Sequence, residues 1–164
     1  MNEKLKKYIK SIIKYTILFV IVLNIISYYK STDLNKEKLD IKSFTLLDGS
    51  IYEIKNDKPL LVHFWASWCP ICSLEEQNIE KISKDYEVLT IATQSGNNKE
   101  IEEYLKNNSL TFNVVNDEDG ILSKKFNIKA FPTTFIYDEN QNQKFTEVGY
   151  TSTFGLYLRM WWSK

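Results

Sequence analysis

Apolar residues recur along the chain with two different periods, which separate predicted strands from predicted helices. After residue 42, nearly continuous apolar runs of strand length alternate with segments whose apolar residues have helical spacing. We predict strands at 59–65, 87–93, 111–117, 133–138 and 143–149, and helices at 70–84, 97–108, 120–126 and 151–162. Strands that alternate with helices form parallel units, and the last two strands flank a polar turn typical of an antiparallel hairpin. The pattern predicts an α/β fold with a mixed sheet flanked by helices.

The N-terminal part of the chain has a different pattern. Residues 1–14 contain five lysines and one glutamate, and an apolar run follows that is broken by Asn24 and Ser27. Counted from Ile12, the run would form a helix of roughly 27 Å, close to the hydrocarbon core of a bilayer at about 30 Å. By the positive-inside rule the lysines stay in the cytoplasm. We therefore predict that residues 1–29 are a cytoplasmic tail and a single-pass membrane anchor.

Two alternatives to an uncleaved anchor stay open at this point. A cleavable signal peptide also begins with basic and then apolar residues, although no pair of small residues marks a cleavage site here. A buried core helix is the other alternative. Residues 30–42 are charged and lack periodicity, so we predict a linker there and a globular domain at residues 43–164. Asp48-Gly49 lies between two short apolar runs and predicts a hairpin at the start of this domain.

Length and charge narrow the possible functions. The chain has 164 residues, of which 43% are hydrophobic, enough for one domain with a core. Lysine and arginine balance aspartate and glutamate at 21 each. Because nucleic acids are held mainly by an excess of basic residues, we expect no nucleic-acid partner.

Both cysteines lie where the first long strand meets the first helix of the domain. A helix N-terminus carries partial positive charge, which stabilises a thiolate on Cys69 and lowers its pKa from about 8.5 to roughly 3.5 to 7.5. Pro70 can occupy the first helical position, where its missing N–H costs nothing. Cys72 lies one turn further, where its sulfur can reach Cys69 and release a mixed disulfide. We predict that Cys69 is the nucleophile and Cys72 the resolving cysteine.

Two other uses of the cysteine pair are weaker. A structural disulfide across so short a loop would restrict little of the unfolded chain. A zinc site would need two further ligands, and His63 is the only histidine. We therefore predict no metal and no cofactor beyond a redox-active disulfide between Cys69 and Cys72.

The segment FWASWCPIC, followed some sixty residues later by AFPTTFIYD, resembles the thioredoxin superfamily. Within it, the chain resembles the membrane-anchored TlpA/ResA/CcmG-like thiol-disulfide oxidoreductases of bacteria, over about residues 43 to 160. The resemblance implies a thioredoxin-like fold, a cis peptide bond before Pro132, and a substrate strand that pairs with the backbone at Ala130 and Phe131. The implied substrate-binding residues are Trp68, Pro70, Ile71, Phe131 and Pro132.

The resemblance also draws attention to Glu75 and His63. Glu75 matches a glutamate that assists proton movement in ResA-like members, and its alternative is a solvated residue favoured by the helix dipole. His63 occupies the position where thioredoxins keep a buried acid. If it lies beneath Cys72, a neutral imidazole can accept the proton of Cys72. Its alternative is a histidine that is merely hydrogen-bonded within the sheet.

These expectations combine into one leading function. We expect an extracytoplasmic thiol-disulfide oxidoreductase that exchanges its disulfide with cysteines of exported proteins, together with an integral membrane thiol-redox partner. Ile71, between Pro70 and Cys72, leaves the direction of exchange open. The ending GYTSTFGLYLRMWWSK further resembles the ScsD-type branch, unless Trp161 and Trp162 are simply core-facing aromatics.

The second hypothesis is a copper-binding chaperone of the Sco kind on a thioredoxin fold. Those proteins use Cys-x-x-x-Cys with a histidine that follows it. Here the spacing is one residue shorter and His63 precedes the cysteines, which disfavours a three-ligand Cu(I) site.

Overall fold

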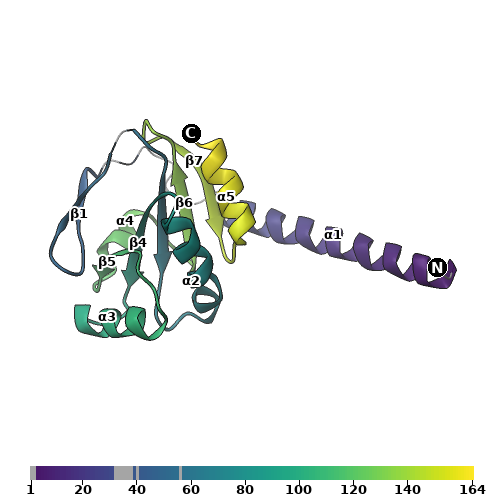
Figure 1. The fold of residues 1–164 in the computed structure, drawn as a ribbon, viewed down its shortest axis with the longest axis horizontal. Coiled ribbons are helices and arrows are strands. Elements are labelled where there is room, and N and C mark those ends of the chain that lie inside the picture. The colour runs from purple at the N-terminus through teal and green to yellow at the C-terminus, as the bar shows by residue number, and fades with distance from the viewer. Residues whose placement is uncertain (1–2, 32–38, 40, 56) are drawn as a thin grey trace.

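A computed structural model of the protein describes residues 3–31, 39, 41–55 and 57–164 (Figure 1). The chain begins with the long helix α1 (Glu3–Ser31), and a short hairpin of β1 (Ser43–Thr45) and β2 (Ile51–Glu53) opens the domain. The elements that follow are β3 (Leu60–Trp65), α2 (Pro70–Ser83), β4 (Glu87–Thr93), α3 (Asn98–Asn107), β5 (Asn113–Asp117), α4 (Ile121–Lys125), β6 (Thr133–Tyr137), β7 (Gln143–Val148) and α5 (Thr153–Trp162). Every strand and helix that the pattern predicts within the domain is present, with boundaries within two residues.

The central sheet has the strand order β5-β4-β3-β6-β7. β3 pairs in parallel with β4, and β4 with β5, whereas β6 runs antiparallel to both β3 and β7. The sheet is therefore mixed, as predicted. β1 and β2 form a separate antiparallel pair, and the turn between them contains Gly49 at a φ of 81°, a conformation that glycine adopts without strain. This order places β3, which leads into the cysteines, at the centre of the sheet.

Local side-chain bonds explain where two of the helices begin. Asn97 and Glu100 form a capping box at the start of α3, in which each side chain accepts a hydrogen bond from the other residue's backbone N–H. The side chain of Ser152 accepts a hydrogen bond from the N–H of Gly155 and caps α5. Each cap satisfies N–H groups that the first turn of the helix leaves unpaired.

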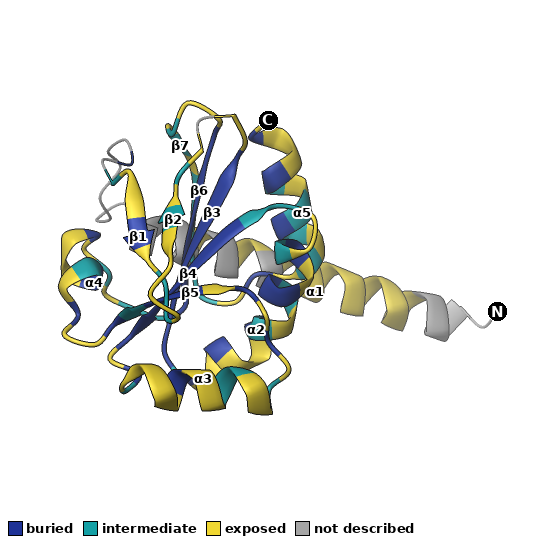
Figure 2. Cartoon of the chain, turned by 60° about the vertical axis from the view of Figure 1, so that its left-hand side comes forward, coloured by how far each residue is buried: buried dark blue, intermediate teal, exposed yellow. Residues whose placement is uncertain are grey.

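Side chains from the two faces of the sheet enter two separate clusters. One contains Leu61 and Trp65 of β3 together with apolar residues of α2, α3 and α5. The other contains Val62 and Phe64 of β3 together with residues of β1, β5 and β6 and the residue after α4, Phe126. Figure 2 shows β3 and β6 buried between these layers. The alternation along β3 therefore gives the sheet two chemically different faces.

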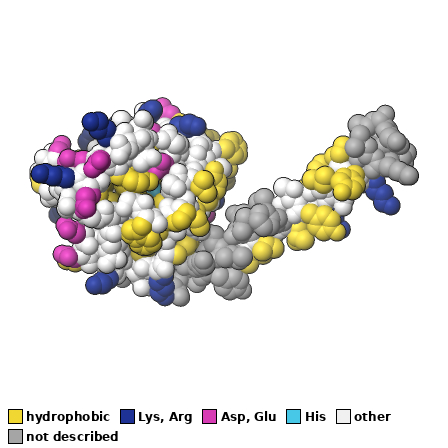
Figure 3. Space-filling model, turned by 90° about the horizontal axis from the view of Figure 1, so that it is seen from below, with side chains coloured by type: hydrophobic (Ala, Val, Ile, Leu, Met, Phe, Trp, Pro, Cys, Tyr) yellow, Lys and Arg dark blue, Asp and Glu magenta, His cyan; other side chains and the backbone are white. Residues whose placement is uncertain are grey.

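Helix α1 extends away from the domain and contacts β7. Many of its apolar side chains are exposed, including those of Ile12, Ile13 and Ile17 (Figure 3). Across the described stretches of the chain, no helix combines the length and the apolar character needed to cross a bilayer. The predicted anchor stays a prediction, and most of the predicted linker lies outside the described residues.

The structure of the C-terminal helix excludes one alternative that the sequence left open, namely that its two tryptophans face the core. Trp161 and Trp162 are exposed to 61% and 70%, so they are not core-facing aromatics. The helix is instead buried through Leu156 and Met160. Both are fully inaccessible and lie in the same cluster as the cysteines.

Candidate active site

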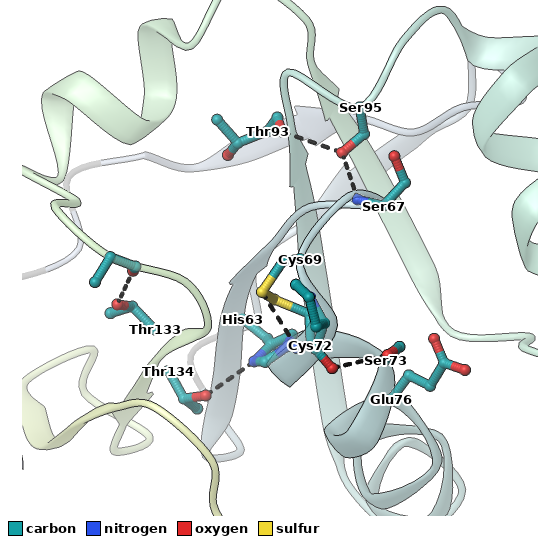
Figure 4. The surroundings of a disulfide bond; sticks show 12 residues. His63, Ser67, Cys69, Cys72, Ser73, Glu76, Thr93, Ser95, Thr133 and Thr134 are labelled. Carbon is teal, nitrogen blue, oxygen red and sulfur yellow. Dashed lines mark hydrogen bonds between the residues drawn. A yellow bond between two sulfur atoms is a disulfide. The ribbon is translucent and has the colours of Figure 1, made fainter.

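Cys69 and Cys72 form a disulfide at the beginning of α2, with their Cα atoms 5.3 Å apart (Figure 4). Cys69 is the N-cap residue in an extended conformation, and Pro70 occupies the first turn, as predicted. The Cys69 Sγ accepts a hydrogen bond from the N–H of Cys72 at 3.2 Å. Its carbonyl oxygen accepts another from the N–H of Ser73 at 3.2 Å. Cys69 therefore caps the helix with its sulfur, in the place where serine or aspartate usually supplies an oxygen.

This position favours a thiolate on Cys69 once the disulfide is reduced. The first turn of α2 contains no acidic residue, so no carboxylate offsets the partial positive charge of the helix N-terminus. That charge and the N–H of Cys72 both stabilise a thiolate on Cys69. Cys72 is 2% exposed and Cys69 6%, so the first cysteine is slightly closer to solvent.

Exposed apolar groups surround the entry to the disulfide. Trp68 is 59% exposed and packs edge-on against Phe131, with the ring centroids 5.7 Å apart. Its Nε1 donates a hydrogen bond to the carbonyl oxygen of Gln94 at 3.0 Å, which holds the indole in place. Pro70 and Ile71 are also exposed. The tryptophan and the phenylalanine, which come from segments far apart in the sequence, thus form one aromatic wall.

The bond between Phe131 and Pro132 is cis, as the resemblance implied. Pro132 is buried at the start of β6, and its carbonyl oxygen accepts a hydrogen bond from the N–H of Gly149 at 2.8 Å. Thr133 donates a side-chain hydrogen bond to the carbonyl oxygen of Ala130 at 2.8 Å. These bonds fix the segment that precedes β6 against the end of β7.

His63 lies in the middle of β3, and Figure 4 shows its ring directed toward Thr134. The residue is 2% exposed, and its Nδ1 lies 2.9 Å from the hydroxyl oxygen of Thr134, its register partner on β6. Burial lowers the pKa of His63 to about 3. The imidazole is therefore neutral at physiological pH, but with this pKa it is a weak acceptor for a thiol proton.

Glu75 lies one turn after Cys72 and is fully buried, which contradicts the alternative of a solvated residue. Its Oε1 accepts a hydrogen bond from the N–H of Thr151 at 3.2 Å, while Oε2 is buried without a hydrogen-bond partner. Burial raises the pKa of Glu75 to about 8, and the nearby charge of Glu147 acts in the same direction. A carboxyl group with this pKa is well matched to a cysteine thiol for proton exchange.

The structure also identifies residues that the sequence did not indicate. Thr134 holds His63, the backbone of Thr151 holds Glu75, and the carbonyl of Gln94 holds Trp68. Ser95 accepts a hydrogen bond from the N–H of Ser67 at 3.0 Å and so fixes the loop that leads to Cys69. All four lie far from the cysteines in the sequence. Only strand register and loop conformation bring them to the site.

No metal-binding group is apparent in the part of the chain that the structure describes. There, no three side chains of histidine, cysteine, aspartate or glutamate gather closely enough to hold an ion. The two sulfurs of the site are joined to each other. The arrangement as it stands is suited to disulfide exchange.

Comparisons with known proteins agree with this geometry. The sequence matches the AhpC/TSA family over residues 32–145. It is 28% identical to a thioredoxin-like protein of Haemophilus influenzae over 98% of each chain. It is 26% identical to sporulation thiol-disulfide oxidoreductase A of Bacillus subtilis, over 80% of this chain and 87% of the relative. The crystal structure of StoA from Bacillus subtilis superposes with a TM-score of 0.62 at 28% identity, covering 73% of this chain and 93% of that one. The fold is thus thioredoxin-like, as predicted.

Proposed function

Because this chain belongs to the AhpC/TSA family, we propose that it is a membrane-anchored, extracytoplasmic thiol-disulfide oxidoreductase that exchanges disulfides with cysteines of exported proteins. The observation that carries the proposal is the disulfide between Cys69 and Cys72, with Cys69 as the cap of α2. Sporulation thiol-disulfide oxidoreductase A, a relative of similar length, is named for the same reaction, thiol-disulfide exchange.

The mechanism follows from the two sulfurs. In the reducing direction, the Cys69 thiolate attacks one sulfur of a substrate disulfide, and the other substrate sulfur leaves as a thiolate that takes up a proton. Cys72 then loses its proton and attacks the Cys69 sulfur, which releases the second substrate thiol and closes the Cys69–Cys72 disulfide. An integral membrane thiol-redox partner returns two electrons and two protons. In the oxidising direction the same steps run in reverse.

Resolution requires a group that accepts the proton of Cys72, and we assign this role to Glu75. Its buried position one turn from Cys72 and its raised pKa support the assignment. His63 is assigned a positioning role beneath Cys72, because its lowered pKa makes it the weaker proton acceptor. The assignment predicts that Glu75→Gln slows resolution more than His63→Ala, while the first attack by Cys69 is nearly unchanged in both.

The proposed substrate surface consists of Trp68, Pro70, Ile71, Phe131 and Pro132. The exposure of Trp68 and Ile71 and the aromatic contact with Phe131 support this surface. A substrate cysteine that reaches Cys69 must bring its neighbouring residues against these side chains. An extended substrate segment beside the cis-proline would pair with the backbone at Ala130 and Phe131.

For location, we propose that α1 holds the domain at the outer face of the inner membrane. The exposed apolar side chains of α1 and the lysines that begin the chain support this. The full-length protein is expected to stay with the membrane fraction after an alkaline carbonate wash. Quantitative release into the supernatant would contradict an anchor without affecting the redox proposal.

The redox proposal is tested on the full-length protein with two matched variants. Cys72→Ser should accumulate a mixed disulfide with substrate through Cys69, whereas Cys69→Ser should accumulate none.

The midpoint potential of the Cys69–Cys72 disulfide gives the direction of exchange. It is read by tryptophan fluorescence after equilibration with dithiothreitol or glutathione. A value near about −250 mV indicates a reductase and one near about −130 mV an oxidase. A reduced Cys69 that alkylates no faster than glutathione at neutral pH would contradict the function itself.

A further inference from the structure

A row of polar side chains crosses the sheet beneath α2. His63 on β3 is the register partner of Thr134 on β6, and Thr134 is the register partner of Glu147 on β7. Register partners on adjacent strands point to the same face of a sheet with their Cβ atoms about 5 Å apart. His63 lies between Leu61 and Trp65 of the cluster that α2 and α5 cover. The row therefore runs from the cysteines to the C-terminal helix.

Arg159 of α5 binds Glu147, the last residue of this row. Its Nε donates to Oε1 of Glu147 at 2.7 Å, and its Nη1 donates to the carbonyl oxygen of Gly155 at 3.0 Å. The side chains of Arg159 and Glu147 are 23% and 18% exposed. Because solvent screens a partly buried ion pair less than a surface pair, each of these charges acts over a longer distance.

Glu75 is hydrogen-bonded to the segment that joins the two elements of this ion pair. The N–H that binds its Oε1 belongs to Thr151, in the short segment that joins β7 to α5. Its Oε2 is buried with no hydrogen-bond partner, so the carboxyl group has little local compensation for a negative charge. Among the charged groups on neighbouring elements, Glu147 of β7 acts on Glu75, and Arg159 of α5 is bonded to Glu147. Cys72 of α2, His63 of β3 and Tyr150 of the joining segment are further titratable groups on the elements around it.

We propose that the Glu147–Arg159 ion pair is a positioning device that sets the charge state of Glu75, and through it the pH range in which Cys72 resolves a mixed disulfide. The inference rests on the proposed function of Glu75 as proton acceptor. The charge of Glu147 opposes ionisation of Glu75, and the positive charge of Arg159, bonded to Glu147, offsets part of that effect. Removing either partner leaves the other uncompensated, so the two removals act on Glu75 in opposite directions.

The test uses Arg159→Met and Glu147→Gln in the full-length protein, with the rate of resolution measured from pH 5 to pH 10 in single turnovers. Arg159→Met should move the midpoint of the rate profile to higher pH by about one unit, and Glu147→Gln should move it to lower pH by a similar amount. Lys144→Met is the matched control, because it removes another ion pair of β7, with Asp138 at 3.1 Å. It should leave the midpoint in place.

A merely structural role gives a different result. Loosening of α5 would lower the rate at every pH without moving the midpoint, and midpoints that move in the same direction, or stay fixed, in both variants would overturn the proposal. In a Glu75→Gln background both shifts should disappear, and their persistence would assign the titration to another group and likewise overturn it. Failure of the proposed function is recognised separately, since the Cys72→Ser variant would then accumulate no mixed disulfide with a substrate.

Discussion

The two faces of the central sheet are built by the same strands and differ in what they bury. One face gathers Phe64, Phe126, Phe135 and Tyr137, whose neighbouring rings lie 5.0 to 6.3 Å apart. The other face buries the disulfide together with His63, Thr134 and Glu75 among its apolar residues. Polar groups are costly to bury and apolar rings favourable. The aromatic face therefore supplies stability that lets the opposite face hold chemically useful but destabilising groups.

The largest expected effect comes from breaking the aromatic face. Phe135 is fully buried and contacts Phe64, Phe126 and Tyr137, so Phe135→Ala should lower the free energy of unfolding by about 3 to 5 kcal/mol. Urea unfolding measures this loss. Exchange activity per folded molecule should be retained, because none of these rings touches the disulfide. A loss below about 1 kcal/mol would show that stability does not reside on this face.

The next effect concerns Glu75 and depends on pH. Its pKa is raised by burial from 4.5 to about 8, so the native protein holds a proton that the unfolded chain releases between these values. The contribution of Glu75 to stability is thus complete below about pH 4.5 and is lost as pH rises through about 8. Glu75→Gln should match the parent near pH 5 and exceed it by a few kcal/mol at pH 9. A difference in stability between the variant and the parent that is the same at pH 5 and pH 9 would contradict this.

A smaller effect is expected on the polar face at neutral pH. Thr134→Val removes the partner of His63 Nδ1 but keeps the volume, so it should cost about 1 to 3 kcal/mol. The same substitution made in a His63→Leu background should cost much less, because the bond is already absent there. Equal costs in the two backgrounds would mean that the 2.9 Å contact contributes nothing to stability.

The smallest effect on stability is expected at the exposed rim of the site. Ile71→Ser should change the free energy of unfolding by less than about 0.5 kcal/mol, because the side chain is 46% exposed. It should nevertheless slow reduction of a protein disulfide several-fold. Ile51→Ser, an exposed position on β2, is the matched control and should alter neither quantity. Equal exchange rates in both variants would remove Ile71 from the substrate surface.

The sequence predicts the elements of this fold well because its signals are local. Strand runs, helical spacing and the caps at Asn97 and Ser152 all act within a few residues, so the boundaries agree closely. The spacing of Cys69 and Cys72 is equally local, and their pairing at the helix start follows from it.

The remaining features of the site depend on long-range contacts. Thr134 meets His63 only because β3 and β6 pair in one particular register. Glu75 is buried because the segment around Thr151 returns over α2, 76 positions later in the chain. No local pattern distinguishes such a glutamate from a solvated one. The exposure of Trp161 and Trp162 is set in the same way, by the rotation of α5 that buries Leu156 and Met160.

The sulfur cap of α2 has a consequence for how the protein responds to its surroundings. The group that donates to the Cys69 sulfur is a peptide amide, which neither gains nor loses a proton anywhere in the biological range. A change of pH would therefore leave this hydrogen bond to the Cys69 sulfur in place. If Glu75 accepts the proton of Cys72 as proposed, we expect the pH dependence of the cycle to arise in its second half, at this carboxyl group one turn further along the helix.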